Sequence, residues 1–110
     1  MKLFDLHCDT AYEMRKRRMH LDKNDLMVSL SGASKIEKYR QIMAIWSDCK
    51  KNDEECFKEY NLILGNLNHE LELNGICDFP ISVEDARILH GNIERVEKLY
   101  SDGVAVITPV

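Results

Sequence analysis

Four short apolar runs, separated by segments with helical patterning, constrain the fold of this chain more than any other feature. The runs lie at residues 3–10, 41–47, 79–85 and 104–108. The second and fourth are almost continuously apolar, as is typical of strands in a parallel sheet that helices cover. The last three strands alternate with helices, which is the order of βαβ units. The pattern therefore predicts an α/β fold with parallel strands.

Two long helices are predicted between the last three strands. The first begins at Asn52 or Asp53, ends at Asn74-Gly75, and carries apolar residues at spacings of three and four. These apolar residues are Phe57, Tyr60, Leu64, Leu67 and Leu71. The second helix follows Asn92, ends at Gly103, and has an apolar stripe of Ile93, Val96 and Tyr100. We expect a short helix at residues 11–19 and a small strand or a loop anchor at residues 26–30. We expect a turn at residues 31–34.

The first predicted strand carries three polar side chains. Strand alternation places Asp5, His7 and Asp9 on one face, and Leu6 and Cys8 on the other. Polar groups on an otherwise apolar strand are costly to bury unless they are satisfied. An imidazole and a carboxylate two residues apart can bind one divalent cation such as zinc. The alternative is a half-exposed strand whose polar face meets water.

Glu84 extends this pattern to the third predicted strand. It lies at the carboxyl end of that strand, on the side of its polar residues. In a (β/α)8 TIM-type barrel the carboxyl ends of the strands carry the active site, but such a barrel takes about 250 residues. We therefore expect residues 1–110 to form a single incomplete domain, the N-terminal half of a barrel. Its unpaired edge strands favour a homo-oligomer.

Composition excludes some classes of partner. The net charge of −4 argues against a nucleic-acid partner, and no apolar run approaches the roughly 18 residues of a membrane span. The basic run at residues 15–18, His20 and His69 are expected at the surface, although a metal role for His20 is the alternative. The four cysteines, Cys8, Cys49, Cys56 and Cys77, have no framework spacing. We expect reduced thiols and, because Asp5 and Asp9 interrupt any signal peptide, a cytoplasmic protein.

The segments DLHCDT, QIMAIWS, SVED and NIERVEKLYSDGVAVITPV together resemble the N-terminal part of the renal, or membrane, dipeptidase family. These enzymes are zinc hydrolases of the amidohydrolase barrel superfamily of metal-dependent hydrolases. The resemblance covers most of this chain but only roughly the first third of such an enzyme. It implies that His7 and Asp9 bind one zinc, that Glu84 bridges two, and that Asp5 orients the ligands.

One departure from the family concerns the bridging carboxylate. The family usually has glycine soon after it, whereas this chain has Glu84-Asp85-Ala86. The assignment of the bridge to Glu84 or Asp85 therefore stays open, and strand alternation favours Glu84 because Asp85 should face the helices.

The resemblance implies a zinc-dependent dipeptidase, a metallopeptidase that hydrolyses dipeptides through a hydroxide bridging two zinc ions. No catalytic residue beyond the metal ligands is expected within these residues, so this segment alone should hydrolyse dipeptides poorly. One alternative is an amidohydrolase that acts on another amide. Another alternative is a non-catalytic half-barrel that binds a metal or associates with itself.

Overall fold

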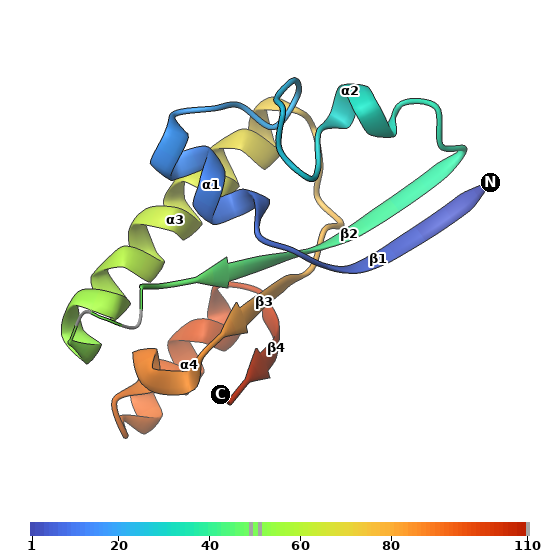
Figure 1. The fold of residues 1–110 in the computed structure, drawn as a ribbon. Coiled ribbons are helices and arrows are strands. Elements are labelled where there is room, and N and C mark those ends of the chain that lie inside the picture. Colours follow the sequence, from blue (N-terminus) through green and yellow to red (C-terminus); the bar gives the residue numbers. More distant parts are fainter. Residues whose placement is uncertain (49, 51, 110) are drawn as a thin grey trace.

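The computed structural model describes residues 1–48, 50 and 52–109, and it has an α/β fold (Figure 1). Its single sheet contains four parallel strands in the order β1-β2-β3-β4. The strands are β1 (Lys2–Cys8), β2 (Lys38–Trp46), β3 (Ile81–Glu84) and β4 (Val104–Thr108). The helices are α1 (Thr10–Arg17), α2 (Leu30–Ala33), α3 (Asp53–Leu73) and α4 (Ile93–Ser101), with the short 3₁₀ helix η1 (Ala86–Leu89) after β3. The predicted parallel α/β fold is therefore confirmed.

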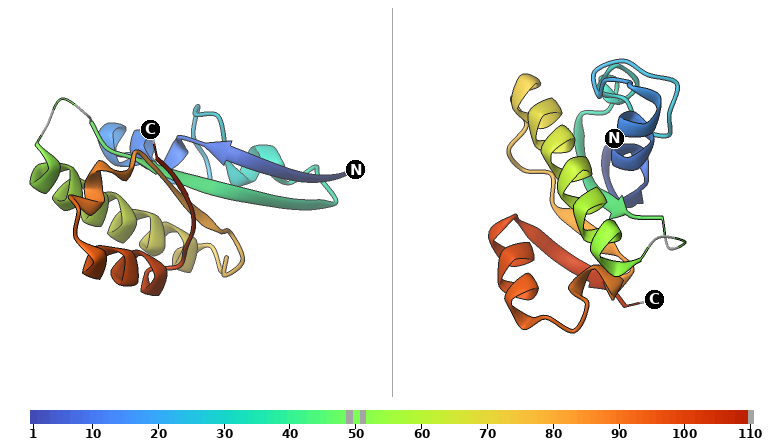
Figure 2. Two further views of the ribbon diagram at one scale, coloured as in Figure 1. Left: turned by 90° about the horizontal axis from the view of Figure 1, so that it is seen from below. Right: turned by 90° about the vertical axis from the view of Figure 1, so that its left-hand side faces the viewer.

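The order of the strands follows the order of the chain. Each strand pairs with its neighbours in sequence, whereas a doubly wound sheet reverses its strand order at a switch point. All four strands thus end at the same edge of the sheet, as Figures 1 and 2 show. Side chains at the ends of β1 and β3 are brought to that edge together.

The two faces of the sheet differ in what packs on them. Residues that are paired in a parallel ladder lie on the same face of the sheet. Met43 is paired with Ile81, and Ile45 is paired with Val83. This covered face packs against the helices and is 0–5% exposed; its members are Cys8, Met43, Ile45, Ile81 and Val83. The opposite, open face presents side chains to solvent at the carboxyl edge; its members there are Trp46, Glu84, Val106 and Thr108.

Helix α3 forms where its predicted start, stripe and stop indicate. The side chain of Asn52 caps it by accepting a hydrogen bond from the backbone N–H of Glu55 at 2.9 Å. Asn74 is the C-cap, and Gly75 follows with a φ of 65°. The stripe is buried apart from the half-buried Phe57, and it is wider than predicted, since Cys56, Ile63 and Glu70 are also buried.

The predicted stripe of α4 is wrong. Ile93 is 74% exposed, Tyr100 is 83% exposed, and the buried apolar residue of this helix is Leu99. The face toward α3 is formed by charged residues with long stems: the Arg95 guanidinium lies 4.1 Å from the Phe57 ring centroid. Such side chains cover apolar surface while their charges reach polar partners, which a count of apolar spacings does not detect.

The segment between α1 and β2 differs from its prediction in detail. Residues 26–29 form no strand and anchor the loop through the buried Val28, and residues 30–33 form the helix α2 where a turn was predicted. The Ser29 side chain caps α2 by accepting from the backbone N–H of Gly32 at 3.2 Å. The predicted third strand at residues 79–85 is longer than β3, which begins at Ile81 and ends at Glu84, before the positive φ of Asp85.

The surface positions predicted for the basic run and for His69 are confirmed. The basic run at residues 15–18 and His69 are exposed. Cys8 and Cys77 carry free thiols, whereas Cys49 lies outside the described residues. Within the described part of the chain, no helix combines the length and the apolar content that a bilayer crossing requires.

Candidate metal centre

Strand β1 contains a bulge between Asp5 and Cys8. Asp5 aligns with Gln41 and Cys8 with Met43. Between these two pairs β1 advances by three residues, whereas β2 advances by two. An extra residue of this kind interrupts the alternation of side chains along the strand. The predicted pairing of Leu6 with Cys8 on one face is therefore wrong: Leu6 is 66% exposed and Cys8 is 4% exposed.

Because of the bulge, Asp5 does not lie on the face of the sheet on which it was predicted. Asp5 and Cys8 align with Gln41 and Met43, which are two residues apart, so both lie on the covered side of the sheet. Asp5 still contacts His7, because its Oδ1 accepts a hydrogen bond from the His7 backbone N–H at 3.2 Å. The contact to His7 thus runs through the main chain, while a role in orienting zinc ligands stays a prediction.

Cys8 belongs to the core, as expected for a residue that points away from the site. Its Sγ donates to Met43 Sδ at 3.6 Å, and burial raises the pKa of the thiol above its ordinary value. A raised pKa keeps the thiol protonated at neutral pH and opposes a role as a thiolate ligand.

His7, Asp9 and Glu84 come together at the carboxyl edge of the sheet. His7 Nε2 lies 3.2 Å from Asp9 Oδ1 and 3.8 Å from Glu84 Oε2, and one ligand atom from each residue lies within 4.8 Å of the others. His7 is near the end of β1, Asp9 precedes the first residue of α1, and Glu84 ends β3. The predicted convergence of these three side chains is confirmed.

The backbone after β3 directs the side chains of Glu84 and Asp85 to different places. Asp85 has a φ of 76° and is 8% exposed, and its Oδ1 accepts from the Arg87 backbone N–H at 3.0 Å. Its side chain therefore caps η1, while Glu84 joins the cluster. A positive φ favours glycine, and this is the stretch in which the resembled family usually has glycine.

The chemistry and spacing of these residues fit a divalent cation. Two ligands on one tetrahedral zinc lie about 3.4 Å apart when each bond is about 2.1 Å long. The distances of 3.2 and 3.8 Å from His7 Nε2 bracket that spacing. The side chains of His7, Asp9 and Glu84 are 52, 57 and 40% exposed, so an ion can approach them from solvent.

Two further residues at this edge were not predicted as part of the site. Trp46 ends β2 and aligns with Glu84 in the ladder, so it lies on the open face between β1 and β3. The ring of Tyr12, from α1, meets it edge-on with centroids 4.8 Å apart. The position of Trp46 at the carboxyl end of a predicted strand was the signal that could have identified it.

His20 lies outside the cluster. Its Nδ1 is 2.8 Å from Glu70 Oε1, and the second oxygen of that buried carboxylate accepts from the Leu21 backbone N–H at 2.8 Å. His20 therefore holds the loop after α1 against α3 through Glu70, and the alternative of a metal role at this site is not favoured by the geometry.

Comparison of the chain with protein-family models, with curated proteins and with solved structures finds no match. These comparisons therefore do not identify a family for the chain.

Proposed function

We propose that this chain is the metal-binding N-terminal half of a zinc-dependent dipeptidase with a (β/α)8 barrel. The observation that carries the proposal is the convergence of His7, Asp9 and Glu84 at the carboxyl edge of a parallel sheet. The sequential strand order supports the barrel, since that is the order in which the strands of such a barrel follow one another. The resemblance to the renal dipeptidase family supplies the substrate class, a dipeptide.

In this proposal His7, Asp9 and the Glu84 carboxylate would hold the zinc. Zinc in such a site supplies a nucleophile from water at neutral pH and polarises a carbonyl group. The residues of this chain bind and orient: the two carboxylates supply negative charge, and the Asp5 carboxylate fixes the main chain at His7. Because both carboxylates are exposed, a dipeptide can reach the same edge of the sheet.

A second function, self-association, is favoured by the edge strands. β1 and β4 flank the sheet, and they expose Phe4 (55%), Leu6 (66%) and Val106 (48%). Unpaired edges with apolar side chains promote association, and a two-fold pairing is the commonest form of it. Sedimentation across a dilution series tests this proposal, and a monomer at every concentration would contradict it.

Zinc titration by calorimetry tests the metal site directly. The titration uses a Cys77→Ser background, because this exposed thiol would otherwise compete for zinc. We expect His7→Ala and Glu84→Gln to weaken zinc binding by more than about 100-fold. That factor is the upper limit for substitutions of residues that only orient a metal ligand. His69→Ala is the matched control, since His69 is exposed outside the cluster. Equal loss in His69→Ala and His7→Ala would overturn the site.

Dipeptide hydrolysis tests the activity. Residues 1–110 with zinc should turn over dipeptides poorly, because three ligands do not complete a two-zinc site and catalytic groups act as a unit. A longer chain that carries these residues and the remaining strands of the barrel should be active and should lose activity with Glu84→Gln. Full activity of residues 1–110 alone, or an inactive longer chain that binds zinc, would contradict the proposal.

A further inference from the structure

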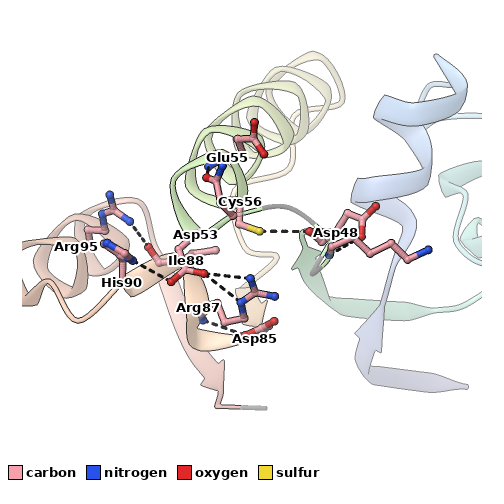
Figure 3. Close-up of polar contacts among 11 residues, drawn as sticks. Asp48, Asp53, Glu55, Cys56, Asp85, Arg87, Ile88, His90 and Arg95 are labelled. Atoms are coloured by element: carbon pink, nitrogen blue, oxygen red, sulfur yellow. Dashed lines mark hydrogen bonds and ion pairs between the residues drawn. The ribbon is translucent and has the colours of Figure 1, made fainter.

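The segment that follows Glu84 is fixed to the start of α3 by a group of polar contacts (Figure 3). Residues 85–90 leave β3, form η1, and contain two residues with positive φ, Asp85 and His90. Neither is glycine, so side-chain contacts rather than backbone freedom must hold this conformation. The residue of α3 that makes these contacts is Asp53.

Asp53, the first residue of α3, uses both of its carboxylate oxygens on this segment. Its Oδ1 accepts from Arg87 Nε at 3.2 Å and lies 3.1 Å from Arg87 Nη2. Its Oδ2 lies 2.9 Å from His90 Nδ1. The hydrogen bond with His90, followed by those with Arg87, lowers the pKa of the Asp53 carboxyl below its ordinary value. Asp53 therefore joins two points of the segment, three residues apart.

These contacts connect to Glu84 through one short path. Arg87 binds Asp53 by its side chain, and its backbone N–H donates to Asp85 Oδ1 at 3.0 Å. Asp85 directly follows Glu84, and its own backbone N–H donates to the Thr108 carbonyl of β4 at 3.0 Å. The direction in which Glu84 leaves β3 thus depends on Asp85, and the position of Asp85 depends on Arg87 and Asp53.

We propose that Asp53 is a positioning residue for the metal centre, which acts through Arg87 and Asp85 to hold the Glu84 carboxylate beside His7 and Asp9. This inference rests on the proposed function, because it assigns Asp53 to the same site. Substitutions behind a metal ligand typically reduce metal affinity about 10- to 100-fold. Asp53 is separated from Glu84 by two intermediate residues, so we expect the lower end of this range.

The neighbouring residue, Glu54, provides a matched control. It lies in the same first turn of α3, and its Oε1 is 2.6 Å from Arg95 Nη2. Arg95 Nη1 in turn donates to the Ile88 carbonyl at 2.8 Å. Glu54 therefore also ties α3 to this part of the chain, but it does so through Arg95 of α4 and the Ile88 carbonyl. Both acids lie in the first turn of α3, so isosteric neutralisation of either one removes a negative charge that the helix dipole favours there.

The test compares Asp53→Asn with Glu54→Gln in the Cys77→Ser background. Zinc affinity is measured by calorimetry, and the melting temperature is measured without zinc. We expect Asp53→Asn to weaken zinc binding about tenfold and Glu54→Gln less than twofold, with similar melting temperatures. Unchanged affinity in Asp53→Asn, or an equal loss in both variants, would overturn the positioning role.

Amide hydrogen exchange separates this inference from the metal proposal. Asp53→Asn should speed exchange at the Asp85 and Arg87 amides while leaving α1 unchanged, and Glu54→Gln should not. If the unsubstituted chain binds no zinc, the proposed function fails, and exchange still decides whether Asp53 holds this segment. Unchanged exchange at both amides in Asp53→Asn would refute the role irrespective of zinc.

Discussion

The two faces of the sheet differ in what they contribute. The covered face carries the apolar core, and the open face carries the proposed metal site. On the covered face Met43 and Val83 are 0 and 1% exposed, and they pack against α1 and α3 in one core. On the open face the side chain of Glu84 is 40% exposed, and its carboxylate lies near that of Asp9. Burial of apolar area stabilises the fold, whereas two adjacent carboxylates repel each other unless a cation joins them. Substitutions on the two faces should therefore have effects of different size.

The largest effect is expected in the core beneath the covered face. Leu67→Ala removes a fully buried side chain of α3 and should lower the free energy of unfolding by about 3 kcal/mol. Urea denaturation monitors the loss. Leu62→Ala, on the exposed side of the same helix, should change it by less than about 0.5 kcal/mol. Equal losses would show that the covered face is not the core.

A smaller loss is expected from the polar contact that anchors the loop after α1. Glu70→Gln removes the charge that accepts from the Leu21 backbone N–H and meets His20, and it should cost about 2 kcal/mol. Glu72→Gln, an exposed change two residues away, serves as the control in the same denaturation experiment. A silent Glu70→Gln would indicate that Val28 and its apolar neighbours anchor this loop without help.

The same contact should make stability depend on pH. The hydrogen bond to Glu70 raises the pKa of His20 above its ordinary value of 6.5. A histidine whose pKa is raised by folding contributes stability that is complete below about pH 6.5 and declines as the pH rises through the folded pKa. The difference in urea midpoint between the unsubstituted chain and His20→Gln should therefore be larger at pH 5.5 than at pH 8.5. His69→Gln, a change at an exposed histidine of α3, is the matched control.

The smallest effect on folding is expected on the open face. Glu84→Gln in zinc-free buffer should change the free energy of unfolding by less than about 0.5 kcal/mol, because its partners are exposed. The same substitution should nearly abolish zinc binding. A stability loss comparable to that of Glu70→Gln would mean that the cluster is a structural contact, and the division between the faces would not hold.

Local signals explain which parts of the structure could be predicted from the sequence. The start of α3 follows from Asn52, its end from Asn74-Gly75, and its burial from apolar spacing along one helix. The convergence of His7 and Glu84 was predicted from strand alternation, from the common edge at which parallel strands end, and from the resemblance to the dipeptidase family. These predictions depend on residues close in sequence or on a general property of the fold.

The parts that were wrong depend on contacts between distant segments. The bulge in β1 exists in the register with β2, so the sequence of β1 alone did not place Asp5 on the covered side. The buried face of α4 is selected by Phe57 and Tyr60 of α3, which receive Arg95 and Lys98 against their rings. Glu70 is buried because the loop after α1 supplies its partners. The spacing of residues close in sequence does not predict these partners of β1, α4 and Glu70.

The positive φ of the backbone at Asp85 limits which amino acids this position can accept. It requires both tolerance of a φ of 76° and a short side chain that accepts from the Arg87 amide. Asparagine meets both requirements, glycine meets only the first, and serine meets only the second. A saturation library at position 85 should therefore be depleted of nearly everything except aspartate, asparagine and glycine. Drift at this position during evolution would be confined to the same three residues.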